Sequence, residues 1–347
     1  MKIGNHLTTY VCGPGAMEQW KGETGDVVIV SNIIDELFPE KVEKIERTMH
    51  IIVNDGESAK SMESYNDLCT KLMELGMGRD NTLWYLGGGT IGDLTGFVAS
   101  TFKRGVGFSA IPTTFLSQID SAIGGKNGIN ISSTKNMVGT FRNPDIILSD
   151  TEFIQGNASI IMDGLPEAIK HGFALNNNII EFLEQTEPEK IISGEKLPEF
   201  IMMNAMAKGE ICNMDPEERG ETRFLLNFGH TVGHGIEAAT HNAISHGTAV
   251  LMGMRMEMLV ASEIEGPIAG DPLAKLDHIV EKYNLKIPKL KQNILEDAWT
   301  YMARDKKILR GEIHIPVIER SGNIRIRKIE LDTLKPIYWK VLGTLSS

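Results

Sequence analysis

The chain has 347 residues, a net charge of -11 and 41% hydrophobic residues, so it is long enough for two domains, each with its own core. The acidic balance disfavours broad nucleic-acid binding, and an anionic substrate must be held by a local group of Lys and Arg side chains. Neither an apolar signal core nor an uncharged run of about 18 apolar residues occurs. Three widely spaced cysteines argue against a disulfide framework. We therefore expect a cytoplasmic protein with no membrane span.

The first part of the sequence alternates apolar, β-rich runs with helical patterns. The runs are DVVIVS, MHIIVN, NTLWYL, GFSAI and DIILS, and an amphipathic stretch at residues 61–75 is one of the helical patterns between them. This alternation predicts a parallel sheet with helical crossovers. We predict that residues 1–157 form an α/β domain.

The second part has a different texture, with long helical patterns at residues 197–212, 229–239 and 248–265. Near the end, GEIHIPVIERSGNIRIRKIE predicts a hairpin with its turn at residues 321–323, and a last helix begins at about Leu331. We predict that residues 158–347 form a mainly helical domain.

A glycine-rich segment, GGGTIG from Gly87 to Gly92, follows the run NTLWYL and leads into a helical pattern. Glycines let a pyrophosphate approach the backbone, and the start of a helix attracts its charge. The segment departs from the standard dinucleotide fingerprint, because no acid stands about 20 residues further on, near Pro112. Taken alone, it fits nucleotide binding and a plain tight turn equally well.

Polar side chains stand at two other strand ends and in one glycine-rich segment. Asp55, Glu57 and Lys60 follow MHIIVN, and Thr113-Thr114 follows GFSAIP, where they would meet a ligand or merely form turns and caps. The segment DSAIGGKNGINISSTKNMVG is expected to be a loop that carries Lys126, Asn130, Lys135 and Asn136. Two ammonium groups and two amides there suit a phosphate or a polyhydroxy acid, although such lysines are often only solvated.

The histidines in NFGHTVGHGIE are the strongest sign of a metal. His230 and His234 are four residues apart and share one helix face, as in the H-E-x-x-H zinc-protease helix, but Thr231 stands where that helix has its general base. His246 follows in ISHG, and Glu167 in GLPEAIKHG is the best-placed acid, early on an apparent helix. Imidazoles and a carboxylate suit zinc; histidines with only a structural role remain the alternative.

Together these segments resemble the 3-dehydroquinate synthase family. The resemblance runs from about residue 50 to 310 and rests on GGGTIGDLTGFVAS, FKRGV, PTTFLSQIDSAIGGKNGIN, KNMVGTF, LPEAIKHG, RFLLNFGHTVGHGIE and SHG. It implies an NAD-binding α/β domain at residues 1–157 and a mainly helical, zinc- and substrate-binding domain at residues 158–347.

The resemblance also implies a role for individual residues. The zinc ligands would be Glu167, His230 and His246. The catalytic and substrate-binding residues would be Arg104, Lys126, Asn136, Lys170, Lys208, Arg223, Asn227, His234 and Lys307, with Arg104 supplied by the neighbouring subunit of a homodimer. The NAD site would use Asp55, Glu57, Lys60, Gly88, Gly89, Asp93, Thr113, Thr114, Asp120, Lys126 and Lys135, with Asp120 and Lys135 at the nicotinamide end.

The implied enzyme is a carbon–oxygen lyase of the shikimate pathway, which leads to chorismate and the aromatic amino acids. It takes a phosphorylated sugar acid, 3-deoxy-D-arabino-heptulosonate 7-phosphate, to 3-dehydroquinate and phosphate. Hydride passes to NAD, phosphate leaves, the hydride returns and an aldol step closes the ring, with zinc, or cobalt in its place, as Lewis acid. Because the leaving phosphate is a suitable base, no glutamate is needed at position 231.

Four positions depart from the family's usual residues without removing a predicted ligand. Thr248 replaces Glu, Asn127 replaces Thr, Pro166 replaces Ala and His171 replaces Tyr. Three other functions stay open: another sugar-phosphate cyclase, a polyol or glycerol-phosphate dehydrogenase of the related superfamily, and a non-catalytic NAD-binding or metal-storage protein. The pair Glu167 and Lys170, together with the GGK and KN elements, favours the cyclase.

Overall fold

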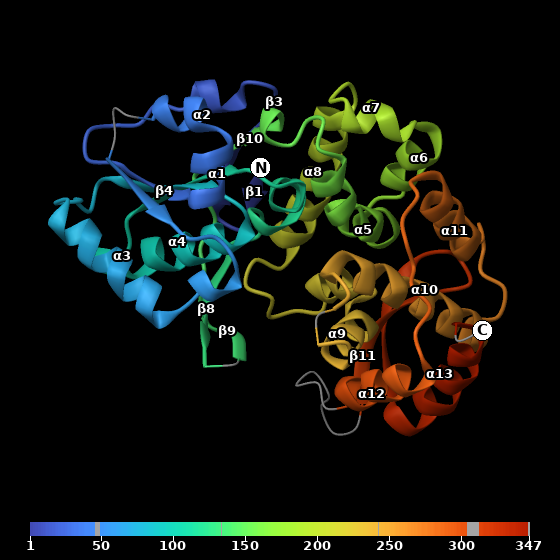
Figure 1. Ribbon diagram of the computed structural model, residues 1–347. Helices are drawn as coiled ribbons and strands as arrows, with labels where there is room; N and C mark the ends of the chain where they lie inside the picture. The colour runs from blue at the N-terminus through green and yellow to red at the C-terminus, as the bar shows by residue number, and fades with distance from the viewer. Residues whose placement is uncertain (46–48, 133, 242, 304–311, 346–347) are drawn as a thin grey trace. The chain divides into compact units, whose positions relative to one another are not determined.

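The computed structural model describes residues 1–45, 49–132, 134–241, 243–303 and 312–345 (Figure 1). Contacts divide the chain into two compact units, one of Met1–Ile161 with Glu189–Glu217 and one of Met162–Pro188 with Glu218–Ser347. The first unit therefore includes α8 (Leu197–Met214), which lies far along the sequence. The domain boundary at residue 157 stays a prediction.

A six-stranded parallel sheet forms the centre of the first unit. Its order is β3 (Thr9–Gly13), β10 (Ile146–Asp150), β7 (Gly107–Pro112), β6 (Thr82–Gly87), β4 (Val27–Ser31) and β5 (Met49–Val53). The five predicted strands and their parallel arrangement are confirmed. Residues 27–30 are fully buried, as expected for a strand inside a parallel sheet that helices cover. The edge strand β3 was not predicted, because TYVCG is short and has no clear apolar run.

The order of the strands defines where a ligand is expected. From β4 the chain moves outward to β5, whereas β6, β7 and β10 follow one another on the other side of β4. In an open parallel sheet, ligands bind outside the carboxyl ends of the strands at such a switch point. Ser31 ends β4 and the glycine segment follows β6, so both lie at this position.

Helices complete the first unit. They are α1 (Asn32–Leu37), α2 (Pro39–Glu43), α3 (Met62–Glu74) and α4 (Gly89–Thr101), with a small sheet of β1 (Lys2–Ile3) and β2 (His6–Leu7). α4 packs against β4, β6 and β7, and α3 packs against α4. The predicted amphipathic helix is α3, and the hydroxyl of Ser61 caps it by accepting from the backbone N–H of Ser64.

The segment after Gly125 is a hairpin and not the expected loop. β8 (Lys126–Ile131) and β9 (Thr134–Phe141) pair in antiparallel fashion, and the hairpin extends away from the six-stranded sheet (Figure 1). The glycines explain the difference, because Gly128 and Gly139 lie opposite each other and a Cβ on Gly128 would lie 2.9 Å from the carbonyl oxygen of Val138. Here glycine permits close strand pairing instead of marking a loop.

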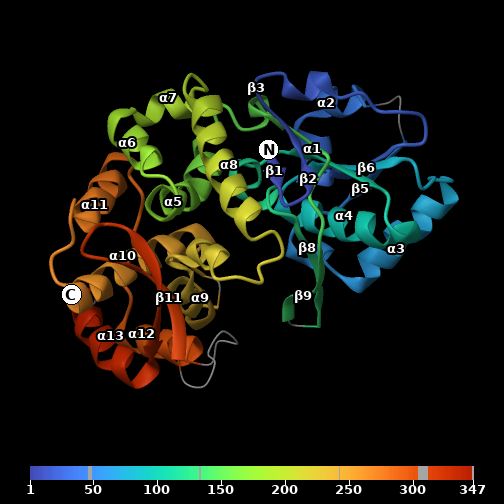
Figure 2. The same ribbon diagram turned by 180° about the vertical axis from the view of Figure 1, so that it is seen from behind.

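The second unit is mainly helical, as predicted. Its helices are α5 (Ala158–Ala174), α6 (Asn178–Gln185), α9 (His230–Ala239), α10 (His246–Glu265), α11 (Pro272–Lys282), α12 (Gln292–Met302) and α13 (Leu331–Leu345), and α7 (Pro188–Ile192) lies at its border. The hairpin of β11 (Glu312–Ile318) and β12 (Ile324–Glu330) has the predicted turn. α10 packs against α9, α11, α13 and β11 (Figure 2). No helix in the described part of the chain is long and apolar enough to cross a membrane.

Candidate active site

Three helices of the second unit bring together the predicted metal ligands. Glu167 lies in α5, His230 is the first residue of α9 and His246 is the first residue of α10. Oε1 of the buried Glu167 lies 3.2 Å from Nε2 of His230 and 3.3 Å from Nε2 of His246. One atom from each residue can therefore reach the same small volume, within 4.8 Å of the others.

Glu167 lies in the middle of α5, which corrects the expectation that it stands early in its helix. The helix begins at Ala158 and continues through Pro166, although a proline is usually found in the first turn of a helix. Glu167 Oε2 forms an ion pair with Nζ of Lys170, one turn further on, and both side chains are 3% exposed. The predicted pair of Glu167 and Lys170 is therefore buried within one helix.

Glycines allow the three helices to approach one another closely. A Cβ on Gly247, next to His246, would lie 2.4 Å from the carbonyl oxygen of Asp163 in α5. A Cβ on Gly253 would lie 1.9 Å from the carbonyl oxygen of Gly229, which precedes α9. The backbone of α10 thus touches both neighbouring helices, and this contact brings the two histidines to Glu167.

The other nitrogen of each histidine has its own partner. Nδ1 of His230 lies 3.2 Å from the carbonyl oxygen of Phe228, and Nδ1 of His246 lies 3.1 Å from Oε2 of Glu237. Such partners orient a metal-binding imidazole and leave its Nε2 for the ion. Glu237 was not predicted as a site residue, although it stands seven residues after His230, two turns along the same helix face.

The electrostatics of the cluster favour a positive charge. Burial raises the pKa of Glu167, but Lys170 and His230 outweigh burial and hold this pKa well below its usual range. Burial lowers the pKa of His246, but hydrogen bonds to Glu167 and Glu237 outweigh it and raise this pKa to about 10. The charge can be a proton on His246 or a divalent cation that displaces it.

His234, Glu237 and His246 form a second group of potential ligands. Glu237 contacts Nδ1 of His246, on the opposite side of the ring from the nitrogen that faces Glu167. A single ion cannot bind both nitrogens of the His246 ring. Of these two groups, only the one with Glu167 has a buried carboxylate. The exposed His234 lies beside the cluster, with its ring centroid 5.3 Å from that of His230.

In the first unit, several of the predicted cofactor residues follow the carboxyl ends of the strands near the switch point of the sheet. Asp55 follows β5 and accepts a hydrogen bond from the hydroxyl of Ser31 at 2.7 Å, while its N–H donates to Oδ1 of Asn32 at 2.8 Å. A hollow of about 290 Å³ lies between this strand end and α3, with Val53 and Leu68 in its lining, and none of the predicted cofactor residues lines it. Ser31 and Asn32 were missed by the sequence analysis, because only the strand order places them here.

Lys60 connects the cofactor residues to the hairpin. Its buried Nζ lies 2.7 Å from Oδ2 of Asp93 and also donates to Oδ1 of Asn136 in β9. Burial raises the pKa of Asp93, against the opposing effect of Lys60. Oε1 of Glu57 accepts from the Asn130 amide at 2.8 Å. Asn136, which the resemblance places with the substrate, thus contacts a side chain of the predicted NAD set.

Asp120, which is predicted to bind NAD, forms an ion pair with Lys208, which is predicted to bind the substrate. Asp120 lies in a π-helical turn at Ser117–Ser121, an irregularity that often marks a functional site. The buried Lys208 of α8 lies 2.8 Å from Oδ1 of Asp120 and donates to its carbonyl oxygen at 2.7 Å. Thr114 shows the expected capping role, because its Oγ1 accepts from the N–H of Ser117 at 3.1 Å.

The glycine segment forms the start of α4. Gly88 is the N-cap of α4 and offers no side chain to the free N–H groups of its first turn. A Cβ on Gly89 would lie 2.8 Å from Oγ of Ser121, so a side chain would crowd this position. The backbone N–H of Thr113 donates to the carbonyl oxygen of Gly87 at 3.0 Å, and this hydrogen bond joins the ends of β6 and β7.

The remaining predicted residues have varied surroundings. Lys126 and Lys135 are exposed on the hairpin, and Arg223 is 1% exposed within the second unit. Arg104 is exposed and has a φ of +67°, a strained backbone conformation of the kind often found at functional sites. Asn227 is partly buried, and Lys307 lies outside the described residues.

Two of the departures from the family pattern have structural roles. The Asn127 amide donates to the carbonyl oxygens of Gly125 and Arg142, at 2.8 and 2.9 Å, and joins the two strands at the base of the hairpin. Thr248 belongs to the cap of α10, because its Oγ1 accepts from the hydroxyl of Ser245 at 3.0 Å. Neither side chain is needed as a ligand.

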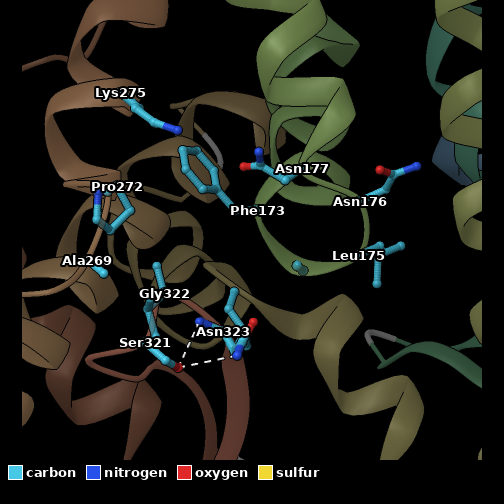
Figure 3. Close-up of a pocket in the computed structure, with 14 residues that line it drawn as sticks. Phe173, Leu175, Asn176, Asn177, Ala269, Pro272, Lys275, Ser321, Gly322 and Asn323 are labelled. Atoms are coloured by element: carbon cyan, nitrogen blue, oxygen red, sulfur yellow. Dashed lines mark hydrogen bonds between the residues drawn. The ribbon is translucent and has the colours of Figure 1, made fainter.

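A further cavity of about 450 Å³ lies in the second unit, at the end of α5 (Figure 3). Phe173 and Lys275 face each other on one side of it, and the turn from Ser321 to Asn323 forms another side. None of the residues predicted for catalysis, metal or cofactor binding lines this cavity. It is therefore separate from the candidate active site.

The fold of this chain, a parallel sheet followed by a mainly helical unit, is that of the sugar-phosphate cyclases. The 2-epi-5-epi-valiolone synthase from Streptomyces hygroscopicus, with NAD⁺ and Zn²⁺ bound, matches 99% of this chain and 98% of its own, with a TM-score of 0.84 and 19% identity. A 2-deoxy-scyllo-inosose synthase with carbaglucose-6-phosphate, NAD⁺ and Co²⁺ matches 96% of each chain, with a TM-score of 0.81 and 22% identity.

Sequence similarity narrows this class to one family. The family model for the N-terminal part of 3-dehydroquinate synthase matches residues 50–161, and that for the C-terminal part matches residues 164–308. The 3-dehydroquinate synthase of Thermoplasma volcanium is 35% identical over 324 residues, which cover 91% of this chain and 89% of that protein. The chain belongs to the 3-dehydroquinate synthase family.

Proposed function

We propose that the protein converts 3-deoxy-D-arabino-heptulosonate 7-phosphate to 3-dehydroquinate and phosphate, with NAD and a divalent metal as cofactors. This is the lyase reaction of its family in the shikimate pathway. The observation that carries the proposal is the cluster of the buried Glu167 with His230 and His246, with the buried Lys170 beside it, in a segment that the family model matches. The cytoplasmic location stays a prediction.

The residues of the cluster fit a zinc or cobalt ion. Two imidazole nitrogens and one carboxylate oxygen are a usual set of three protein ligands for a catalytic zinc, which keeps a further position open. Zn²⁺ and Co²⁺ in the two related cyclase structures support this choice. When bound, the ion supplies a Lewis acid that makes a substrate hydroxyl more acidic. Glu237 keeps the His246 ring oriented toward the ion.

The strand ends of the first unit fit NAD, which when bound accepts a hydride and gives it back. The N–H groups at the start of α4 would hold its pyrophosphate, because Gly88 and Gly89 leave room for close approach. Asp55, fixed by Ser31 and Asn32, would accept from ribose hydroxyls. The proposed NAD set also includes Glu57, Lys60, Asp93, Thr113, Thr114, Asp120, Lys126 and Lys135.

Cationic and amide side chains would hold the phosphorylated, acidic substrate. Lys208 is held in place by Asp120, and Asn136 by Lys60. The proposed set also includes Lys126, Lys170, Arg223, Asn227, His234 and Lys307, and Arg104 of the second subunit in a homodimer. Four of these residues are lysines, and in a chain whose net charge is -11 an anionic substrate needs such cationic side chains.

The test is release of phosphate from the heptulosonate phosphate, with NAD and Zn²⁺ present, by the parent chain and by two histidine variants. We expect release to require both cofactors, to stop on chelation and to return when metal is restored. His230→Ala should lower the zinc content and abolish release, whereas His278→Ala, at an exposed position of α11, should change neither.

Full release by His230→Ala would refute the ligand assignment. If the parent chain released no phosphate from this substrate but did turn over glucose 6-phosphate, another sugar-phosphate cyclase would be the correct function.

A further inference from the structure

Glu257 of α10 is a buried carboxylate near the candidate metal cluster. Glu257 is 3% exposed, and its Oε2 accepts a hydrogen bond from the backbone N–H of Gly229 at 2.8 Å. Burial of a carboxylate is unfavourable unless hydrogen bonds or charges compensate for it. A contact that links residues 28 positions apart, next to a proposed ligand, calls for a functional explanation.

The Gly229 N–H belongs to the start of the helix that carries His230. Gly229 is the N-cap of α9, with a φ of +77°, and it has no side chain to cap the helix. In a capping box, a Glu or Gln at the third helical position accepts from the N–H of the N-cap residue. That position is Val232 in α9, so Glu257 performs this function from another helix.

The same turn fixes the orientation of the His230 ring. Nδ1 of His230 lies 3.2 Å from the carbonyl oxygen of Phe228. The residue between them is Gly229, whose backbone N–H donates to Glu257. Close packing leaves this turn little room, since a Cβ on Gly229 would lie 2.5 Å from Cγ of Met254. A shift of the Glu257 carboxylate would therefore also shift the turn before His230.

We propose that Glu257 is a positioning residue for the metal site: its carboxylate holds the Gly229 N–H and so keeps Nε2 of His230 directed at the ion. The inference rests on the proposed metal cluster. For this role the essential property of the side chain is its reach, because its contact with the start of α9 is a hydrogen bond to one backbone N–H. Partners that orient metal ligands typically contribute about 10- to 100-fold to metal affinity.

Two variants separate reach from charge. Glu257→Asp keeps the charge but withdraws the carboxylate by about 1.5 Å, which is too far for the hydrogen bond. Glu257→Gln loses the charge, but its amide oxygen still reaches the N–H. Glu263→Ala, on the same helix but with its side chain in a surface pair with Lys340, is the matched control.

The metal-free parent and variants are titrated with Co²⁺, and the visible absorption of the bound ion gives both the affinity and the coordination geometry. We expect Glu257→Asp to bind Co²⁺ about 10- to 100-fold more weakly, with an altered spectrum. Glu257→Gln should stay within about fivefold of the parent, since it loses only the charge assistance of the hydrogen bond. Glu263→Ala should match the parent.

Three results would overturn the proposal. Glu257→Asp binding Co²⁺ as tightly as the parent would show that reach is irrelevant, and Glu257→Gln binding as weakly as Glu257→Asp would show that charge is what matters. A parent chain that bound no Co²⁺ would refute the metal cluster and this inference together. The parent titration therefore distinguishes failure of the proposed function from failure of the role of Glu257.

Discussion

Lys41 and Asp150 form a buried ion pair at the carboxyl end of β10. Nζ of Lys41 lies 3.0 Å from Oδ2 of Asp150 and 2.5 Å from Glu152, and Lys41 is 7% exposed. Asp150 also accepts from the backbone N–H of Gly15 at 3.1 Å. The pair joins α2, β10 and the segment after β3, so it contributes to the stability of the first unit.

Lys41→Met should destabilise the protein by about 3 kcal/mol at neutral pH, because it leaves a buried carboxylate without its cation. Burial lowers the pKa of Lys41, but hydrogen bonds to Glu152 and Asp150 outweigh burial and raise it. A raised lysine pKa stabilises the folded chain below the unfolded value of about 10.4, and this stability is lost as the pH rises through the folded pKa.

The measurement is urea unfolding of the parent chain and of Lys41→Met at several pH values. The difference in unfolding free energy should be constant from pH 7 to 9 and shrink above the ordinary lysine pKa. An equal difference at pH 7 and at the highest pH where the parent stays folded would show that the charge of Lys41 is not what stabilises the fold.

Individual site residues could be predicted where a motif repeats the chemistry of a family, as with Glu167, His230 and His246. The residues that orient them were missed, because their role depends on contacts between helices. Glu237 lies in the same motif but acts on a histidine of the next helix, and Glu257 acts from α10 on the start of α9. Spacing within one helix places Glu237 on the face of His230 but does not show that its partner is His246 of the next helix.

At the level of elements, α9 and α10 meet through glycines. Gly229, Gly233 and Gly253 all face the neighbouring backbone, and a Cβ at any of them would lie 3.0 Å or less from an atom of the other helix. This close approach brings His230 and His246 together, with their ring centroids 5.3 Å apart. The separation of the two helices and the geometry of the site are therefore linked.

Gly253→Ala tests this link. Its Cβ would lie 1.9 Å from the carbonyl oxygen of Gly229, so the helices must separate. We expect a loss of about 1–3 kcal/mol in unfolding free energy, the usual cost of overpacking, together with a loss of bound zinc. Ser262→Ala, at an exposed position of the same helix, is the control for both measurements. Gly253→Ala with full zinc content would mean that the spacing of α9 and α10 does not determine metal binding.

Elements with a strong pattern could be predicted from the sequence, and elements made by pairing could not. The central strands are apolar runs buried by the sheet, and α3 has an amphipathic pattern with a Ser cap. β3 has no such pattern and is a strand only because it pairs with β10. The sequence predicts a loop where the β8–β9 hairpin lies, because glycines alone do not show that a facing strand is present.

For the whole molecule, the homodimer is a prediction with a specific consequence. If Arg104 completes the site of its partner, a mixed dimer of Arg104→Ala and His230→Ala subunits contains one site with both intact residues. Random mixing gives half mixed dimers, so two inactive variants should together recover about a quarter of the parent activity. Recovery is measured after the variants are unfolded and refolded together.

No recovery, from a mixture that sedimentation shows to contain mixed dimers, would place Arg104 in the site of its own subunit. A sedimentation mass of 38.3 kDa for the parent chain, which is that of one subunit, would exclude the dimer itself.

In the proposed reaction, a single turnover oxidises and then reduces the substrate. The most direct measurement follows phosphate release and the absorbance of NADH in the same cuvette, with NAD, Zn²⁺ and the heptulosonate phosphate. We predict that phosphate accumulates over many turnovers with no net NADH, because the hydride returns to each substrate molecule. NADH that accumulates in proportion to the substrate consumed would contradict this account and identify a dehydrogenase.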